Sequence, residues 1–251
     1  MENSITKQYL SKVINHLNSI ANQEDNIKKA ADLIVEQVKR NRIIHAYGPG
    51  GHSNLGTQEI FFRAGGLMCI NAILDGGTLL SNGALRSMQI ERLPGYGKIV
   101  IGDYDIQKGD LLIIINAYGI NSATIDAALE AKKLGVKTIG VTSAKHASAT
   151  PENHIARHPS KKNLFEIVDV LLDCEVEVGD AVIEIPGFEQ KVAAMSTFAN
   201  AFLLNSMVAE AVNKLVGEGI KPPVWMSGNA EGGDEWNNRF IDEFKDKIRF
   251  L

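Results

Sequence analysis

The sequence predicts an α/β fold: a three-layer α-β-α sandwich around a parallel, doubly wound sheet, with an N-terminal helical hairpin and C-terminal helices. Short apolar runs, of which 110–115 is the clearest, alternate with helical patterns from residue 42 onward. Continuous rather than alternating apolar runs indicate strands that helices cover on both faces. A glycine-rich turn, Tyr47–Ser53, also joins a β-branched run directly to a helical pattern, as the βα turns of such folds do.

The first 40 residues predict two helices. Apolar side chains recur at helical spacing from Ile5 to Leu17 and again from Ile27 to Val38, and the polar segment 22–25 separates the two stretches. We expect this pair to pack on the core or on a second subunit.

Five strands and the helices between them are expected in the central part. The strands are predicted at 42–47, 67–73, 110–115, 136–141 and 167–172, and the helices at 54–64, 84–93 and 123–134. Residues 176–185 alternate and favour an antiparallel edge or hairpin, and a long helix follows at 193–216. We interpret 1–251 as one domain, with N-terminal helices (1–40), an α/β core (41–192) and C-terminal helices with a tail (193–251).

Composition limits the function classes. With 26 basic and 30 acidic residues the net charge is −4, and no basic stripe indicates nucleic-acid binding. No apolar run reaches the roughly 20 residues of a membrane span, and the polar N-terminus has no signal-peptide core. We therefore expect a cytoplasmic protein. Cys69 and Cys174 lie in apolar runs and are expected to be buried side chains rather than a disulfide or metal pair.

The first loop, Gly48–Ser53, has the features of a phosphate cradle. Its glycines allow close approach and positive φ, and the helix that follows adds partial positive charge at its N-terminus. An ordinary turn that binds nothing is the alternative. The second loop, 116–122, follows the apolar run 110–115, so the two loops are expected to line one crevice at the carboxyl ends of parallel strands.

These motifs, in this order, resemble the sugar isomerase (SIS) domain family. The resemblance rests on the first loop, on Asn116–Asn121, on Ala131-Lys-Lys-Leu-Gly135 and on Ile139-Gly-Val-Thr-Ser143. Further stretches are similar to an uncharacterised subgroup described as candidate phosphoheptose isomerases; they are 59–67, 91–97, 157–160 and 222–235. The resemblance implies a homodimer or homotetramer, a sugar-phosphate ligand and no cofactor.

The residues that match the family's loops are the expected phosphate and sugar contacts. They are Gly48, Gly50, Gly51, His52, Ser53, Asn116, Tyr118, Gly119, Asn121, Ser122, Thr142 and Ser143. The second loop departs from the family pattern, because Asn116, Tyr118 and Asn121 stand where hydroxyl side chains are usual. Its backbone N–H groups, and the hydroxyls of Ser122 and Thr124, are expected to compensate.

Three residues are candidates for proton transfer. Aldose–ketose isomerisation needs a carboxylate or histidine near the C–H bond, with its pKa brought toward neutrality. Glu59, Glu91 and His158 are the candidates. For Glu59 the alternative is a solvated helix residue or a surface ion pair with Arg63, and for Glu91, at the end of a helix, it is a structural role. His158 lies beside Arg157 in a loop after the carboxyl end of a strand.

The remaining polar clusters stay open. His146, His154 and His158 could form a metal cluster, but no paired carboxylate or cysteine accompanies them, so no metal is expected. The acidic tail Glu231–Glu235 either caps the last helix or reaches a neighbouring subunit. The sequence thus predicts a phosphosugar-binding protein, with aldose–ketose isomerase as the leading activity. The alternatives are a non-catalytic sugar-phosphate sensor and a sugar-phosphate lyase.

Overall fold

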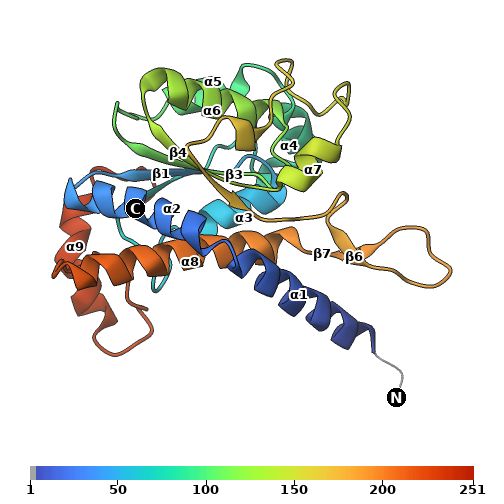
Figure 1. Ribbon diagram of the computed structural model, residues 1–251. Coiled ribbons are helices and arrows are strands. Elements are labelled where there is room, and N and C mark those ends of the chain that lie inside the picture. The colour runs from blue at the N-terminus through green and yellow to red at the C-terminus, as the bar shows by residue number, and fades with distance from the viewer. Residues whose placement is uncertain (1–3) are drawn as a thin grey trace.

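The computed structural model describes residues 4–251 and confirms the α/β class (Figure 1). Five parallel strands form one sheet in the order β2-β1-β3-β4-β5. Their bounds are β1 Ile44–Tyr47, β2 Ile70–Ile73, β3 Leu111–Ile115, β4 Lys137–Thr142 and β5 Val170–Asp173. Because β1 lies between β2 and β3, the winding direction reverses there, and the loops after β1 and β3 flank this switch point.

Helices cover both faces of the sheet, because the strands are apolar on both sides. In β3, Leu111, Ile113 and Ile115 pack toward α2 (Glu24–Lys39) and α8 (Ser196–Gly217), while Leu112 and Ile114 pack toward α5 (Tyr96–Gly102) and α6 (Ser122–Leu134). All five side chains are fully buried. Each contributes roughly 2 kcal/mol of hydrophobic stabilisation, so this strand anchors all three layers.

The N-terminal helices are both present, and their arrangement refines the expected hairpin. Helix α1 (Ile5–Ala21) begins at Ser4, whose hydroxyl accepts a hydrogen bond from Lys7 N at 3.3 Å. Helix α2 follows α1 roughly end to end, and α1 projects away from the sheet (Figure 1). The two helices do not fold back on each other because the apolar side of each packs against α8.

Two short helices were not expected from the sequence. Helix α5 lies between the predicted helix 84–93 and the predicted strand 110–115, where the sequence predicts no element, and α7 (Ala144–Ala149) directly follows β4. The glycines of α5 read as turn signals, but Gly97 serves helix packing: a Cβ there would overlap the carbonyl oxygen of Ala123 on α6. Helix α3 (Gly51–Glu59) also begins three residues earlier than predicted, inside the glycine loop.

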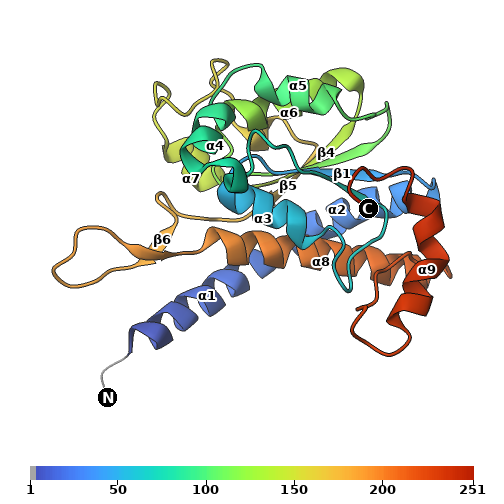
Figure 2. The same cartoon turned by 180° about the vertical axis from the view of Figure 1, so that it is seen from behind.

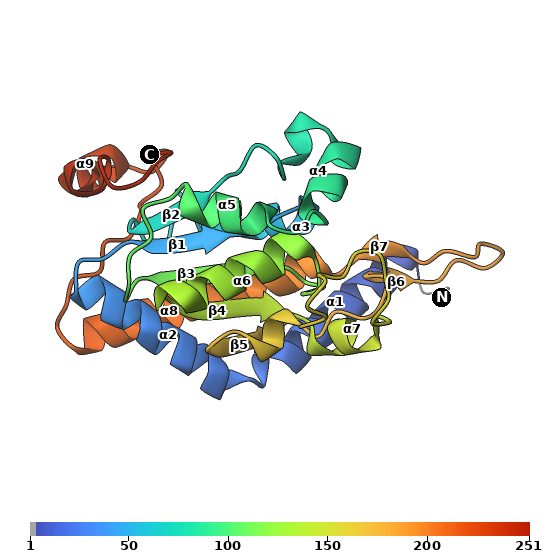
Figure 3. The same ribbon diagram turned by 90° about the horizontal axis from the view of Figure 1, so that it is seen from above.

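Helices α3, α4 (Ala84–Glu91) and α7 gather at the carboxyl end of the sheet (Figure 2). Beyond them, β6 (Ala181–Ile183) and β7 (Val192–Ala194) form an antiparallel hairpin that extends from the body beside α1 (Figure 3). Two 3₁₀ turns complete the connections, at Leu80–Asn82 and Leu164–Glu166.

The C-terminal segment packs against the β2 side of the molecule. Leu67 and Val224 form an antiparallel bridge, and α9 (Gly233–Phe244) follows. Asp234 and Glu235 lie in the first turn of α9, where carboxylates interact favourably with the helix dipole. This placement agrees with the capping role considered for the acidic tail.

Both cysteines are buried and unpaired, as the sequence indicates. Within residues 4–251, the structure has no helix whose length and apolar character would let it cross a membrane.

Candidate functional site

The two glycine-containing loops meet at the switch point of the sheet. Asn116 Nδ2, directly after β3, donates to Ser53 Oγ at 3.2 Å and to the Pro49 carbonyl at 3.5 Å. The rings of His52 and Tyr118, one from each loop, lie edge to face with 4.9 Å between centroids. The two loops therefore form one continuous surface.

The first loop places a carboxylate against the start of α3. Gly50 is the N-cap residue, with φ of 89°, and no side chain caps the helix. A Cβ on Gly50 would overlap Glu91 Oε2, so only glycine leaves room for the carboxylate that α4 brings here. Glu91 thus lies where the backbone N–H groups of a helix N-terminus favour negative charge.

Glu91 has the electrostatic character of an acid–base group. Burial raises the pKa of Glu91 from 4.5 to about 7, and the neighbouring Arg92 guanidinium opposes part of this rise. Near neutral pH both protonation states of Glu91 are therefore populated. A group that titrates near the working pH is suited both to remove a proton and to return it.

Glu91 also lines a cavity of about 380 Å³. The cavity lies between the end of α4, the second loop, α7 with the residues after it, and the segment just before β6. Its wall includes both polar and apolar side chains. Its lining residues are Glu91, Arg92, Tyr118, Ile120, Asn121, His146, Ala149, Thr150, Pro151, His154, Ala156, Val178 and Gly179. This volume suits a small ligand.

Three aromatic rings connect the first loop to this cavity. Tyr118 stacks on His146, with centroids 4.3 Å apart, and meets His52 on its other side. Burial lowers the pKa of both histidines and raises the pKa of Tyr118 to about 12. The imidazoles are therefore neutral and the phenol is protonated near pH 7. His52 Nε2 is buried and has no hydrogen-bond partner among residues 4–251.

In the second loop, two backbone N–H groups form hydrogen bonds within the loop itself. Asn116 Oδ1 accepts hydrogen bonds from Tyr118 N at 3.2 Å and from Gly119 N at 2.8 Å, which forms an Asx-type turn. Gly119, at φ 62°, packs so closely on Thr142 that a Cβ would overlap its hydroxyl. The two N–H groups expected to hold an anion thus already have an internal acceptor.

Three hydroxyl side chains behind this loop are buried from solvent. Ser122, Thr124 and Thr142 are fully buried, and within the described part of the chain their hydroxyl oxygens have no hydrogen-bond partner. Ser143 differs, because its hydroxyl donates to the Val176 carbonyl at 2.7 Å and accepts from His146 N at 3.1 Å. Ser143 therefore serves as the N-cap of α7.

Glu59 lies at the last residue of α3, away from the loops. It accepts a hydrogen bond from Asn205 Nδ2 on α8 at 3.1 Å and pairs with Arg63 Nε at 3.5 Å. Eight residues of helix separate it from Gly51, or about 12 Å along the axis. The geometry therefore agrees with the ion-pair alternative for Glu59, and the cavity lining does not include it.

His158 joins three segments of chain. Its Nε2 lies 3.1 Å from Asp126 Oδ1, and its Nδ1 lies 2.8 Å from Ser160 Oγ. The same Asp126 carboxylate accepts a hydrogen bond from Gly95 N at 2.6 Å. Both ring nitrogens thus have protein partners, an arrangement that holds the loop around residue 158 against α6.

The sequence reasoning missed Arg92 and the stacking of His146 on Tyr118. Glu91 is a candidate from the sequence, whereas Arg92 enters there only as part of a resemblance, because nothing local indicates which residues the end of α4 faces. Asp180 was missed as well; its carboxylate accepts from Met195 N, Ser196 N and Ser196 Oγ at the start of α8. In residues 4–251 no three His, Cys, Asp or Glu side chains group closely enough to hold a metal.

Comparison with known sequences gives a consistent family assignment. The profile described as SIS domain matches residues 8–143. A UPF0309 protein of Geobacillus kaustophilus is 36% identical over 245 residues, which cover 97% of this chain and 96% of the relative. A UPF0309 protein of Listeria innocua is 35% identical over 234 residues, 93% of each chain.

Solved structures share the fold at low sequence identity. A phosphoheptose isomerase of Neisseria gonorrhoeae has a TM-score of 0.56 and 14% identity, over 83% of this chain and 97% of that protein. The NanR protein of Vibrio vulnificus, complexed with ManNAc-6P, has a TM-score of 0.51 and 15% identity, over 99% of this chain and 71% of that protein. The matched profile and the full-length relatives together show that this chain belongs to the SIS domain family and is a member of its UPF0309 group.

Proposed function

We propose that this protein binds a sugar phosphate in the cavity beside Glu91 and interconverts its aldose and ketose forms. One observation carries the proposal: α4 holds a carboxylate with a pKa of about 7 against the glycine loop, at the wall of a cavity of about 380 Å³. The titrating group and the space for a ligand thus coincide at the switch point where α/β folds bind ligands.

The proposed reaction needs two proton movements. Ionised Glu91 removes the proton from the carbon next to the carbonyl, and the electron pair of the broken C–H bond forms an enediolate. Protonated Glu91 then returns the proton to the adjacent carbon. The second proton moves between the two oxygens, and the cavity offers neutral His146 and the Tyr118 hydroxyl for this step.

The family supports this ligand class. Phosphoheptose isomerases and a regulator complexed with a sugar phosphate share the fold. The N-termini of α3 and α6, neither capped by a side chain, approach the same loops and favour an anionic group.

Proton exchange tests the proposal directly. The protein is incubated with C5–C7 aldose and ketose phosphates in deuterated water, and exchange at the carbon next to the carbonyl is followed by NMR. We expect Glu91→Gln to reduce the exchange rate by about 10²–10⁴-fold, the usual contribution of a general base. Glu59→Gln, the comparison variant at the far end of α3, should retain the rate within about threefold. Exchange that survives Glu91→Gln but not Glu59→Gln would contradict the assignment.

A non-catalytic sensor is the second candidate, and the second loop favours it. Asn116 Oδ1 occupies two amides of this loop, so part of the expected phosphate cradle is filled by the protein itself. A sensor predicts a rise in melting temperature with a sugar phosphate and no deuterium incorporation. If no sugar phosphate of the panel binds, both candidates fail.

A further inference from the structure

Arg92 is an unpaired cation in the wall of the cavity. It is partly buried at the end of α4, and its Nε is buried without a hydrogen-bond partner. Within residues 4–251 no carboxylate forms an ion pair with it. A guanidinium presents five N–H donors in a planar fork, and burial without partners is unfavourable for such a group.

Arg157, a second arginine near this end of the sheet, donates its guanidinium hydrogen bonds to groups of the protein. Its guanidinium donates to the carbonyl oxygens of Pro151, Ala147 and Thr150 and to Asn163 Oδ1. Arg157 therefore holds its own loop together and has little capacity left for a ligand. The contrast singles out Arg92 as the guanidinium able to receive an anion in the cavity.

The second loop itself has few donors left for an anion. Its Tyr118 and Gly119 amides donate to Asn116 Oδ1, and the hydroxyls of Ser122 and Thr142 are buried behind it. A phosphate in the cavity would therefore need donors from another element. Arg92 lines the cavity together with Tyr118 and Asn121, so it faces the space next to this loop.

The cavity lining also includes apolar side chains. Ile120, Pro151, Ala156 and Val178 contribute to it, and these side chains offer no donor to an anion. The lining thus combines one guanidinium for the charged end of a ligand with apolar contacts for its carbon skeleton.

We propose that Arg92 holds the phosphate group of the ligand by paired N–H···O hydrogen bonds, in place of the hydroxyl side chains that the second loop lacks. This inference rests on the proposed function, because it assigns the phosphate end of the same ligand. Guanidinium–phosphate pairs are bidentate and charge-assisted, so Arg92 determines specificity for phosphorylated over free sugars.

The position of Arg92 also couples phosphate binding to Glu91. The guanidinium opposes the rise of the Glu91 pKa, whereas burial raises it. A bound phosphate neutralises the guanidinium and adds negative charge nearby, so the pKa of Glu91 should rise when phosphate binds. Tyr118, His146 and His154 are the other titratable groups that line the cavity.

The test compares Arg92→Gln and Arg92→Lys with the wild-type protein. Calorimetric titration is performed with inorganic phosphate, a hexose 6-phosphate and the matching unphosphorylated hexose. Arg92→Gln should weaken binding of both phosphates at least tenfold and leave the free hexose unchanged. Arg92→Lys should recover only part of the affinity. Arg86→Gln, on the same helix but outside the cavity lining, is the control and should bind as wild type.

A second measurement separates this role from a structural one. The pKa of Glu91, followed by carboxyl NMR in the absence of ligand, should be higher in Arg92→Gln than in wild type, because the opposing cation is gone. Phosphate binding unchanged in Arg92→Gln would overturn the inference, even if the protein isomerises sugars. If Arg92→Gln loses phosphate binding while the wild-type protein binds phosphate but exchanges no deuterium, the inference is supported and the isomerase activity is rejected. Wild-type protein that binds neither phosphate would overturn both.

Discussion

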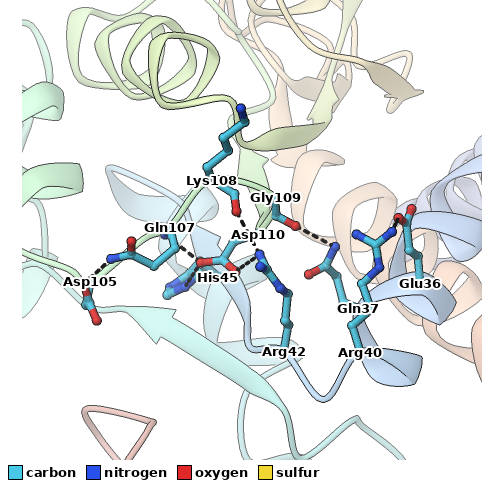
Figure 4. A network of polar contacts seen from close by, with 10 residues as sticks. All are labelled: Glu36, Gln37, Arg40, Arg42, His45, Asp105, Gln107, Lys108, Gly109 and Asp110. Atoms are coloured by element: carbon cyan, nitrogen blue, oxygen red, sulfur yellow. Dashed lines mark hydrogen bonds and ion pairs between the residues drawn. The ribbon is translucent and has the colours of Figure 1, made fainter.

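The two ends of the parallel sheet both carry buried polar side chains, but they satisfy them differently. At the amino ends of β1 and β3, Asp110 accepts hydrogen bonds from Arg42 Nη1 at 3.0 Å and from Gln107 N at 2.7 Å (Figure 4). Arg42 also donates to the Lys108 carbonyl at 2.9 Å, and Gln37 donates to the Gly109 carbonyl at 3.1 Å. These contacts pair the buried Asp110 carboxylate with Arg42, whose side chain is 37% exposed. Gln37 Oε1 is the one buried side-chain atom of this network that has no partner in residues 4–251.

At the carboxyl ends, Glu91 and Arg92 line a cavity, and several buried polar groups lack protein partners within residues 4–251. Arg92 Nε and His52 Nε2 are buried and have no hydrogen-bond partner in residues 4–251. The pKa of Glu91 is about 7, so this carboxyl group titrates near neutral pH. Unsatisfied buried polar groups lower stability, so their concentration at one end marks the end where a ligand completes the structure. The comparison separates a polar cluster that stabilises the fold from one arranged for binding.

Removal of Asp110 should have the largest effect on stability. Asp110→Ala leaves Gln107 N without an acceptor and removes the ion-pair partner of Arg42, which keeps only the Lys108 carbonyl, so the free energy of unfolding should fall by about 3 kcal/mol. Urea unfolding measures the change. Phosphate binding at the opposite end should be unaffected, since no cavity residue contacts Asp110.

A matched control is Asp242→Ala, which removes an exposed ion pair with Lys245. Because both side chains are fully exposed to solvent, it should leave the urea midpoint of unfolding unchanged within error. If Asp110→Ala is equally mild, the amino-end network is not what stabilises the sheet edge.

Substitution of Glu91 should raise the stability of the protein, in contrast to substitution of Asp110. The pKa of Glu91 is about 7 in the folded protein and near 4.5 when unfolded, so the folded state retains a proton that the unfolded chain releases between these values. Stability contributed by protonated Glu91 is therefore complete below pH 4.5 and is lost as pH rises through 7. Glu91→Gln, which remains neutral, should be more stable than wild type at pH 8 by about 3 kcal/mol.

Thermal unfolding at pH 4 and pH 8 checks this prediction. The advantage of Glu91→Gln should disappear at pH 4, where both side chains are neutral. Glu189→Gln, in the exposed loop of the β6–β7 hairpin, should show no advantage at either pH. A Glu91→Gln protein less stable than wild type at pH 8 would mean that the carboxylate is a structural anion acceptor for α3, and the contrast between the two ends would weaken.

The sequence predicted the fold well because its signals are local. The continuous apolar run of β3 and the glycine loop before α3 each specify an element and its place in the sheet. The same locality explains why α5 was missed, since Gly97 and Gly102 weaken its helical pattern. That Gly97 allows close packing on α6 is a tertiary fact that no window of the sequence contains.

The site was predicted only in outline, because its chemistry depends on distant contacts. The loops were identified, but the approach of Glu91 to Gly50 joins residues 41 positions apart on separate elements. His158 was attractive by type, whereas its partner Asp126 on α6 could not be foreseen. The Asn116 turn was accessible to sequence reasoning, since an asparagine two and three residues before Tyr118 and Gly119 is a known turn signal.

Asn116 provides the smallest and most discriminating change. Asn116→Ser removes the oxygen that accepts from Tyr118 N and Gly119 N and places a hydroxyl where SIS domains usually have one. Loss of these hydrogen bonds should lower stability by about 1 kcal/mol. If the freed amides then reach the ligand, affinity for a sugar phosphate should rise about three- to tenfold, which calorimetry resolves.

Asn116→Asp is the control for the acceptor, because it keeps the oxygen that the two amides use, adds a negative charge, and, like Asn116→Ser, loses the Nδ2 donor to the Pro49 carbonyl. It should retain the turn and weaken phosphate binding. Equal affinity in wild type, Asn116→Ser and Asn116→Asp would mean that the phosphate does not approach the second loop at all. In that case the ligand would bind at the carboxyl ends of the strands through Arg92 and the first loop alone. The second loop would then only maintain the fold, as the Asp110 network does.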